Sequence, residues 1–156
     1  MSQVYHPGAQ WLIDNGNLPE KARNIELQDV RKYVAWRNQN QPLVLIHELT
    51  HAYHHRLSYK LNEWQLFTKI RFTRLFLNAF TCIIWNIRTT YESAMANGLY
   101  SNVYARTNDW EYLAETTEAF FSSQPWTSNN RESLLNNDLF PFTINELKPY
   151  DPNGYS

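Results

Sequence analysis

The sequence predicts an α+β fold that is mainly helical and has only a minimal β-sheet. Three stretches are interpreted as helices because of their length and their content of apolar residues: 43–57, 66–87 and 108–122. One short segment, residues 24–27, is interpreted as a strand. No internal period of 20–50 residues stands out, and a single core usually serves a chain of this length. We therefore expect one domain over residues 1–156.

The first forty residues are expected to be irregular with short elements. Turn-forming residues dominate positions 5–17, where one short helix is predicted at 10–14. The strand at 24–27 is followed by a predicted helix at about 29–38. Pro42 ends that pattern, because proline breaks one element and fits the first turn of the next. The helix that follows is expected to be largely buried.

The C-terminal half contains one helix with a clear start signal. Asn108 or Asp109 is expected to be its N-cap, since both side chains accept hydrogen bonds from the first turn. The prolines of the tail, residues 136–156, predict turns over the surface with one helical turn near 145–147.

Composition excludes several classes of protein. Hydrophobic residues make up 43% of the chain and aromatic residues 15%, which argues against disorder. Fourteen basic and fifteen acidic side chains give a net charge of -1, so we expect no nucleic-acid partner. Cys82 is the single cysteine, which excludes an internal disulfide.

No signal peptide is visible, so a cytoplasmic location is the default, or secretion if the chain is N-terminally truncated. The oligomeric state stays open.

The apolar stretch at 66–87 has the overall length of a membrane span but contains charged residues. Lys69, Arg71 and Arg74 interrupt it, and the longest uncharged run covers 13 residues, 75–87. A helix that crosses a bilayer needs about 20 apolar residues. We therefore expect a buried core helix and no clear membrane span.

The pattern His47-Glu48-Leu49-Thr50-His51 carries the strongest chemical signal. Residues four apart lie on one face of a helix, so His47 and His51 could both reach one tetrahedral zinc ion. Glu48 could then act as a general base toward an attacking water molecule. Helical spacing places Leu45, Leu49, Ala52 and Tyr53 on the opposite face. We expect that face to pack and the histidine face to be open. The alternative is a solvated histidine-rich face.

A catalytic zinc site needs a third protein ligand. Glu111, Glu115 and Glu118 share one face of the helix at 108–122. That face is opposite an apolar stripe, so these carboxylates could equally be a solvated surface. Periodicity does not choose between ligand and surface, or among the three glutamates.

The segment from Tyr104 to Glu115 contains a second motif. It resembles the Y-x-x-T-N-x-x-E-[FY]-x-A-E signature of the metallopeptidase domain of anthrax lethal factor and its relatives. The run His47 to Ala52 fits the same family, and shorter likenesses occur at Tyr5-His6-Pro7 and around Phe140 to Lys148. The resemblance covers roughly residues 4–62 and 90–152. Residues 65–88 differ from the family and could be an atypical apolar insert.

The resemblance implies a zincin-like domain of the gluzincin type, which hydrolyses peptide bonds of a peptide or protein substrate with one Zn²⁺ per chain. Carried over by position, His47, His51 and Glu111 are the metal ligands. Glu48 is the general base, Tyr104 stabilises the oxyanion, and Glu115 orients a ligand histidine. His54 and His55 are not expected to bind the metal. The alternatives are a zinc-binding or interaction domain without catalysis and a helical domain without metal.

Overall fold

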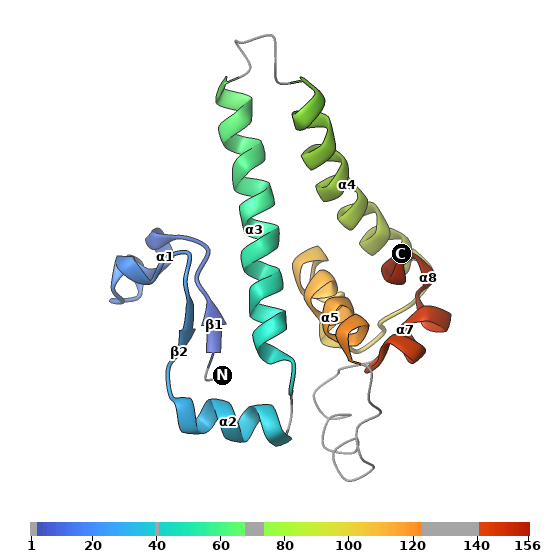
Figure 1. The fold of residues 1–156 in the computed structure, drawn as a ribbon, viewed down its shortest axis with the longest axis horizontal. Coiled ribbons are helices and arrows are strands. Elements are labelled where there is room, and N and C mark those ends of the chain that lie inside the picture. The colour runs from blue at the N-terminus through green and yellow to red at the C-terminus, as the bar shows by residue number, and fades with distance from the viewer. Residues whose placement is uncertain (1–2, 40, 68–73, 123–140) are drawn as a thin grey trace.

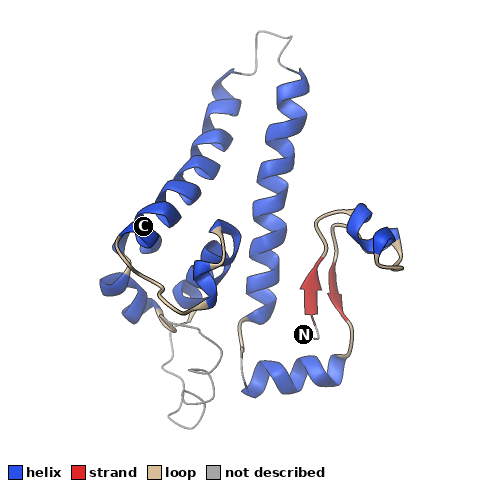
Figure 2. Cartoon of the chain, turned by 180° about the vertical axis from the view of Figure 1, so that it is seen from behind, coloured by secondary structure: helices blue, strands red, loops and turns tan. Residues whose placement is uncertain are grey.

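The computed structural model describes residues 3–39, 41–67, 74–122 and 141–156. Two long helices, α3 (Val44–Phe67) and α4 (Arg74–Ala96), diverge from each other, and α5 (Asp109–Phe121) packs against both of them (Figure 1). A two-stranded sheet lies on the other side of α3 (Figure 2). The prediction of a mainly helical chain with a minimal sheet is confirmed.

The sheet is an antiparallel pair of β1 (Gln3–Tyr5) and β2 (Ile25–Leu27), in which Val4 lies opposite Glu26. The short helix α1 (Ala9–Asp14) and the 3₁₀ turn η1 (Pro19–Lys21) connect the two strands. The sequence predicted β2 and α1, made no assignment for residues 3–4, and assigned Tyr5, the last residue of β1, to irregular structure. This was wrong, because a three-residue strand is defined by its partner rather than by its own composition.

Capping side chains fix where the helices begin. Asn108 accepts hydrogen bonds from the backbone N–H of Trp110 and Glu111, which confirms it as the N-cap of α5. Asp29 does the same for α2 (Val30–Gln39) through the N–H of Arg31 and Lys32. At the end of α4, Gly98 has a φ of 72°, which glycine adopts at no steric cost. The chain then turns back toward α5 through η2 (Tyr104–Arg106).

The tail is more helical than expected. Residues 141–156 form α7 (Ile144–Tyr150) and α8 (Pro152–Tyr155), whereas one helical turn was predicted. Asp151 lies at their junction with 2% of its surface exposed, and its carboxylate accepts hydrogen bonds from Tyr100 and Tyr112. The tail is thereby fastened to the aromatic core of α4 and α5. The predicted tail residues 136–140 lie outside the described residues.

The structure contradicts the predicted burial of residues 82–87, and also the predicted packing face of α3. The described side chains of 82–87 are exposed or half-buried, with Trp85 64% exposed, so this part of the stretch is not a buried core helix. The reason is the divergence of α3 and α4, which leaves an open apolar groove of about 470 Å³ between them and α5. None of the described helices is long and apolar enough to cross a membrane.

The packing face of α3 is the reverse of the predicted one. Leu49 and Tyr53 are 51% and 56% exposed, whereas His47 and Glu48 are each 6% exposed. The amphipathic argument assumed that the apolar face packs. Here the histidine face packs instead, because carboxylates of α5 and a backbone N–H of β1 meet its polar groups.

Candidate metal centre

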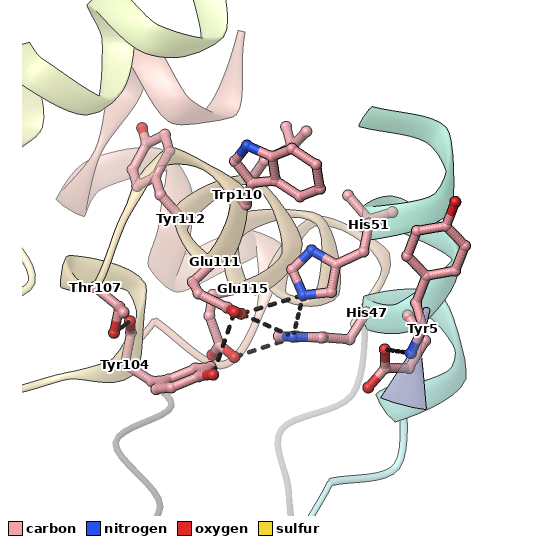
Figure 3. A network of polar contacts seen from close by, with 12 residues as sticks. Tyr5, His47, His51, Tyr104, Thr107, Trp110, Glu111, Tyr112 and Glu115 are labelled. Carbon is pink, nitrogen blue, oxygen red and sulfur yellow. Dashed lines mark hydrogen bonds and ion pairs between the residues drawn. The ribbon is translucent and has the colours of Figure 1, made fainter. Parts of the chain in front are cut away.

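Three of the predicted ligand residues converge where α3 and α5 cross. His47 Nε2 and His51 Nε2, one turn apart on α3, are separated by 3.1 Å. Glu111 Oε2, on the first turn of α5, lies 3.2 Å from each of them (Figure 3). The Asn108 cap starts α5 at the point that brings Glu111 to the histidines. The two helices thus contribute one three-atom cluster, defined here as the triad His47–His51–Glu111.

The triad has the dimensions of a zinc site. Ligand atoms held about 2.0–2.1 Å from a tetrahedral zinc ion lie roughly 3.3 Å from one another. The separations of 3.1, 3.2 and 3.2 Å in the triad differ from that by about 0.2 Å or less. Two imidazole nitrogens and one carboxylate oxygen are also ligands that zinc accepts readily. These residues could therefore hold a metal ion.

The opposite nitrogen of His47 has its own carboxylate partners. Nδ1 lies 2.8 Å from Glu118 Oε1 and 3.3 Å from Glu115 Oε1, and both carboxylates are buried. An acceptor at Nδ1 holds the proton there and leaves Nε2 free to bind a metal. The family resemblance implied that Glu115 orients one of the two ligand histidines, and it implied no such role for Glu118. Glu118 is the nearer partner, and Gln41 Nε2 supports it with a hydrogen bond of 2.6 Å.

A second group of possible metal ligands consists of His47, Glu115 and Glu118. The 2.8 Å separation between His47 Nδ1 and Glu118 Oε1 is that of a direct hydrogen bond. That distance is shorter than the roughly 3.3 Å expected between two ligands of one tetrahedral zinc ion, so these two glutamates fit the orientation of His47 better, and the triad is the candidate metal site. Burial of both glutamates also rules out the alternative in which this face of α5 is a solvated surface.

The carboxylates determine the electrostatics of the centre. Burial by itself would lower the pKa of His47, but hydrogen bonds to Glu111, Glu115 and Glu118 raise it well above the usual value. Burial by itself would raise the pKa of Glu111, but its hydrogen bonds to His47 and His51 lower it. Burial raises the pKa of Glu115. The centre therefore favours positive charge, which a proton or a metal cation supplies.

Tyr104, the predicted oxyanion donor, lies at the rim of this centre. It belongs to η2, directly before α5, and its hydroxyl donates a hydrogen bond to Glu111 Oε1 at 3.2 Å (Figure 3). The residue is 39% exposed, so it is not a core tyrosine. Burial and the adjacent Glu111 carboxylate raise its pKa, which keeps the hydroxyl protonated and able to donate.

Glu48, the predicted base, is not part of the triad, and its carboxylate contacts β1. Its Oε2 accepts a hydrogen bond of 2.7 Å from the backbone N–H of Tyr5 in β1. A position one residue after His47 is rotated by about 100° around the helix, which accounts for this direction. The carboxylate thus lies between α3 and the edge of the sheet.

The histidines after the motif are not a solvated face. His54 is 2% exposed and packs on Trp110, with ring centroids 4.7 Å apart, while His55 Nδ1 lies 2.7 Å from the Tyr5 hydroxyl. Within the described part of the chain, Nδ1 of His51 and of His54 are the buried side-chain atoms without a hydrogen-bond partner. Packing rather than a hydrogen bond at Nδ1 therefore orients the His51 ring.

No family model matches the chain, and comparisons with curated proteins and with solved structures found no match either.

Proposed function

We propose that this protein is a zinc-dependent peptidase that hydrolyses peptide bonds in a zincin-like site. The observation that carries the proposal is the triad His47–His51–Glu111, whose three ligand atoms converge with the spacing of a tetrahedral zinc site. The resemblance of residues 104–115 to the lethal factor family supports the same function. The substrate class is a peptide or protein.

Each residue near the triad has a role in this proposal. His47, His51 and Glu111 would hold a zinc ion, which would supply Lewis-acid chemistry toward the scissile carbonyl and the attacking water. Glu48 accepts the proton of that water and delivers it to the leaving amine. The Tyr104 hydroxyl donates a hydrogen bond to the carbonyl oxygen as it becomes negative. Glu118 and Glu115 hold His47 in the tautomer that presents Nε2.

Metal content tests the first part of the proposal. Protein purified without added metal should contain one zinc ion per chain, and His51→Ala should lose most of it, because a triad with one donor missing binds weakly. Elemental analysis measures both. His55→Ala is the control and should keep its zinc, since its ring faces Tyr5. His54→Ala is unsuitable, because that ring is buried in the core.

Replacement of the base tests catalysis. Glu48→Gln keeps the size of the side chain but accepts no proton, so turnover should fall by about 10²–10⁴-fold while zinc stays bound. Cleavage of an unstructured protein, with and without chelator, is the measurement, and Glu92→Gln on the exposed face of α4 is the control. The alternative is a zinc-binding or interaction domain without catalysis. It predicts that the wild type and Glu48→Gln both contain zinc and that neither cleaves the substrate.

A further inference from the structure

The free edge of β1 faces α3 at the position of Glu48. The His6 N–H donates to Asn24 O on the side of β2, and N–H groups of adjacent residues in a strand point to opposite edges. The Tyr5 N–H therefore points away from the sheet, and it donates to Glu48 Oε2 at 2.7 Å. A main-chain group of the sheet thus contacts the candidate base directly.

Both partners of this bond are removed from water. Glu48 is 6% exposed and Tyr5 8% exposed. A buried carboxylate needs hydrogen-bond donors, and an N–H bond to a charged acceptor is stronger than a neutral one. Because the donor belongs to the backbone, its direction is fixed by the strand. The bond therefore determines where the Glu48 carboxylate points.

A second contact holds the strand in place. The Tyr5 hydroxyl lies 2.7 Å from His55 Nδ1, with ring centroids 5.8 Å apart. Burial lowers the pKa of His55 and raises that of Tyr5, so the contact joins two neutral groups. Tyr5 is thus attached to α3 at Glu48 and at His55, two turns apart on one face of the helix.

We propose that the main-chain N–H of Tyr5 is a positioning group that aims the Glu48 carboxylate in the peptidase reaction. The inference rests on the proposed function, in which Glu48 is the base. It adds a role for the sheet, because β1 then orients a catalytic side chain as well as covering α3.

Amide hydrogen exchange in the zinc-free protein tests the contact without any assay of activity. The Tyr5 amide should be protected, and Glu48→Ala should accelerate its exchange by about tenfold or more. The His6 amide, which is bonded to Asn24, is the internal control and should change little. Equal exchange of the Tyr5 amide in both proteins would overturn the proposal.

Two substitutions of Tyr5 test the role in the reaction. Tyr5→Ala and Tyr5→Pro both lose the phenol, but only proline also loses the N–H, and proline is tolerated where that N–H faces away from the sheet. Turnover of Tyr5→Pro should be about 10–100-fold below that of Tyr5→Ala, with similar KM and zinc content. In a Glu48→Gln background this difference should vanish.

Equal turnover of the two variants, or faster turnover of Tyr5→Pro, would contradict the proposal. These outcomes are distinct from failure of the proposed function. If wild-type protein lacks zinc, or if Glu48→Gln retains turnover, the peptidase assignment falls. The exchange experiment then still reports whether Tyr5 holds the carboxylate.

Discussion

The hydroxyl of Tyr104 donates its hydrogen bond to Glu111 from a partly exposed position. Tyr104→Phe removes that hydroxyl and keeps the ring, so zinc content and melting temperature should change little. Turnover should fall by about 10²–10³-fold, because the donor acts on charge that develops in the transition state. Steady-state kinetics, elemental analysis and a thermal melt are the measurements. Unchanged turnover would remove Tyr104 from the mechanism, and a large loss of melting temperature would give it a structural role.

Glu118 and Glu115 compete for the same nitrogen of His47, at 2.8 and 3.3 Å. Since the shorter contact is the stronger hydrogen bond, Glu118→Gln should weaken zinc binding by about 10–100-fold, which is typical for partners of metal-ligating histidines. Glu115→Gln, the matched control, should have a smaller effect. Competition with a chromophoric chelator measures both affinities. A larger loss in Glu115→Gln would reverse the assignment.

Spacing along one helix predicted the pairing of His47 with His51, because four residues return to the same face of a helix. The partner of Nδ1 was harder to predict. His47 and Glu118 are 71 residues apart, and their contact depends on how α3 and α5 cross. The direction of Glu48 was likewise not predictable, since Tyr5 was assigned to irregular structure and its N–H had no expected position.

The N-cap of α5 links the start of this helix to the candidate metal centre. Asn108→Ala removes the bonds to the N–H of Trp110 and Glu111 and should destabilise the fold by about 1 kcal/mol. Because Glu111 lies on that first turn, zinc affinity should fall together with the melting temperature. Chelator competition and a thermal melt are the measurements. Asn108→Ser keeps a capping oxygen and should retain both properties, and a loss in Asn108→Ser equal to that in Asn108→Ala would argue against the cap.

The start of a helix was predicted well where the sequence contains a capping residue. The face by which a helix packs was not. Asn108 places the beginning of α5 correctly because capping is a local interaction. The packed face of α3 was predicted in reverse. An amphipathic pattern identifies two faces, but the partner element decides which of them is covered, and the partner here is a row of carboxylates.

The C-terminal tail is held to the rest of the molecule by one buried carboxylate. Asp151 accepts hydrogen bonds from Tyr112 at 2.6 Å and Tyr100 at 3.1 Å and also caps α8 through the Gly154 N–H. Burial, with the nearby Asp151, raises the pKa of both tyrosines, so both hydroxyls are donors. Asp151→Asn replaces one of the two acceptor oxygens with an NH₂ group. This group is a donor and cannot accept the hydrogen bonds that the carboxylate oxygen accepts.

Loss of such acceptors in a buried position should cost about 1–3 kcal/mol. For a chain of this length, each kcal/mol lost from the free energy of unfolding lowers the melting temperature by about 2–4 °C. Differential scanning calorimetry is the measurement, and Asn153→Ala at the exposed neighbouring position is the control. Zinc stoichiometry should stay at that of the wild type, because Asp151 contacts the aromatic core and not the triad. Loss of zinc without loss of stability would contradict this separation.

Because the triad joins α3 to α5, its three residues are synthesised at different times. Both histidines of the triad are translated long before Glu111, which follows His47 by 64 residues. At about 5–20 residues per second, a ribosome needs roughly 3–13 seconds to cover that interval. Throughout it the growing chain has only two of its three ligands, and the carboxylates that orient His47 come later still. If the triad holds a metal ion as proposed, tight binding requires that α5 has first been synthesised and has folded onto α3, so metal binding would come at the end of folding rather than at its beginning.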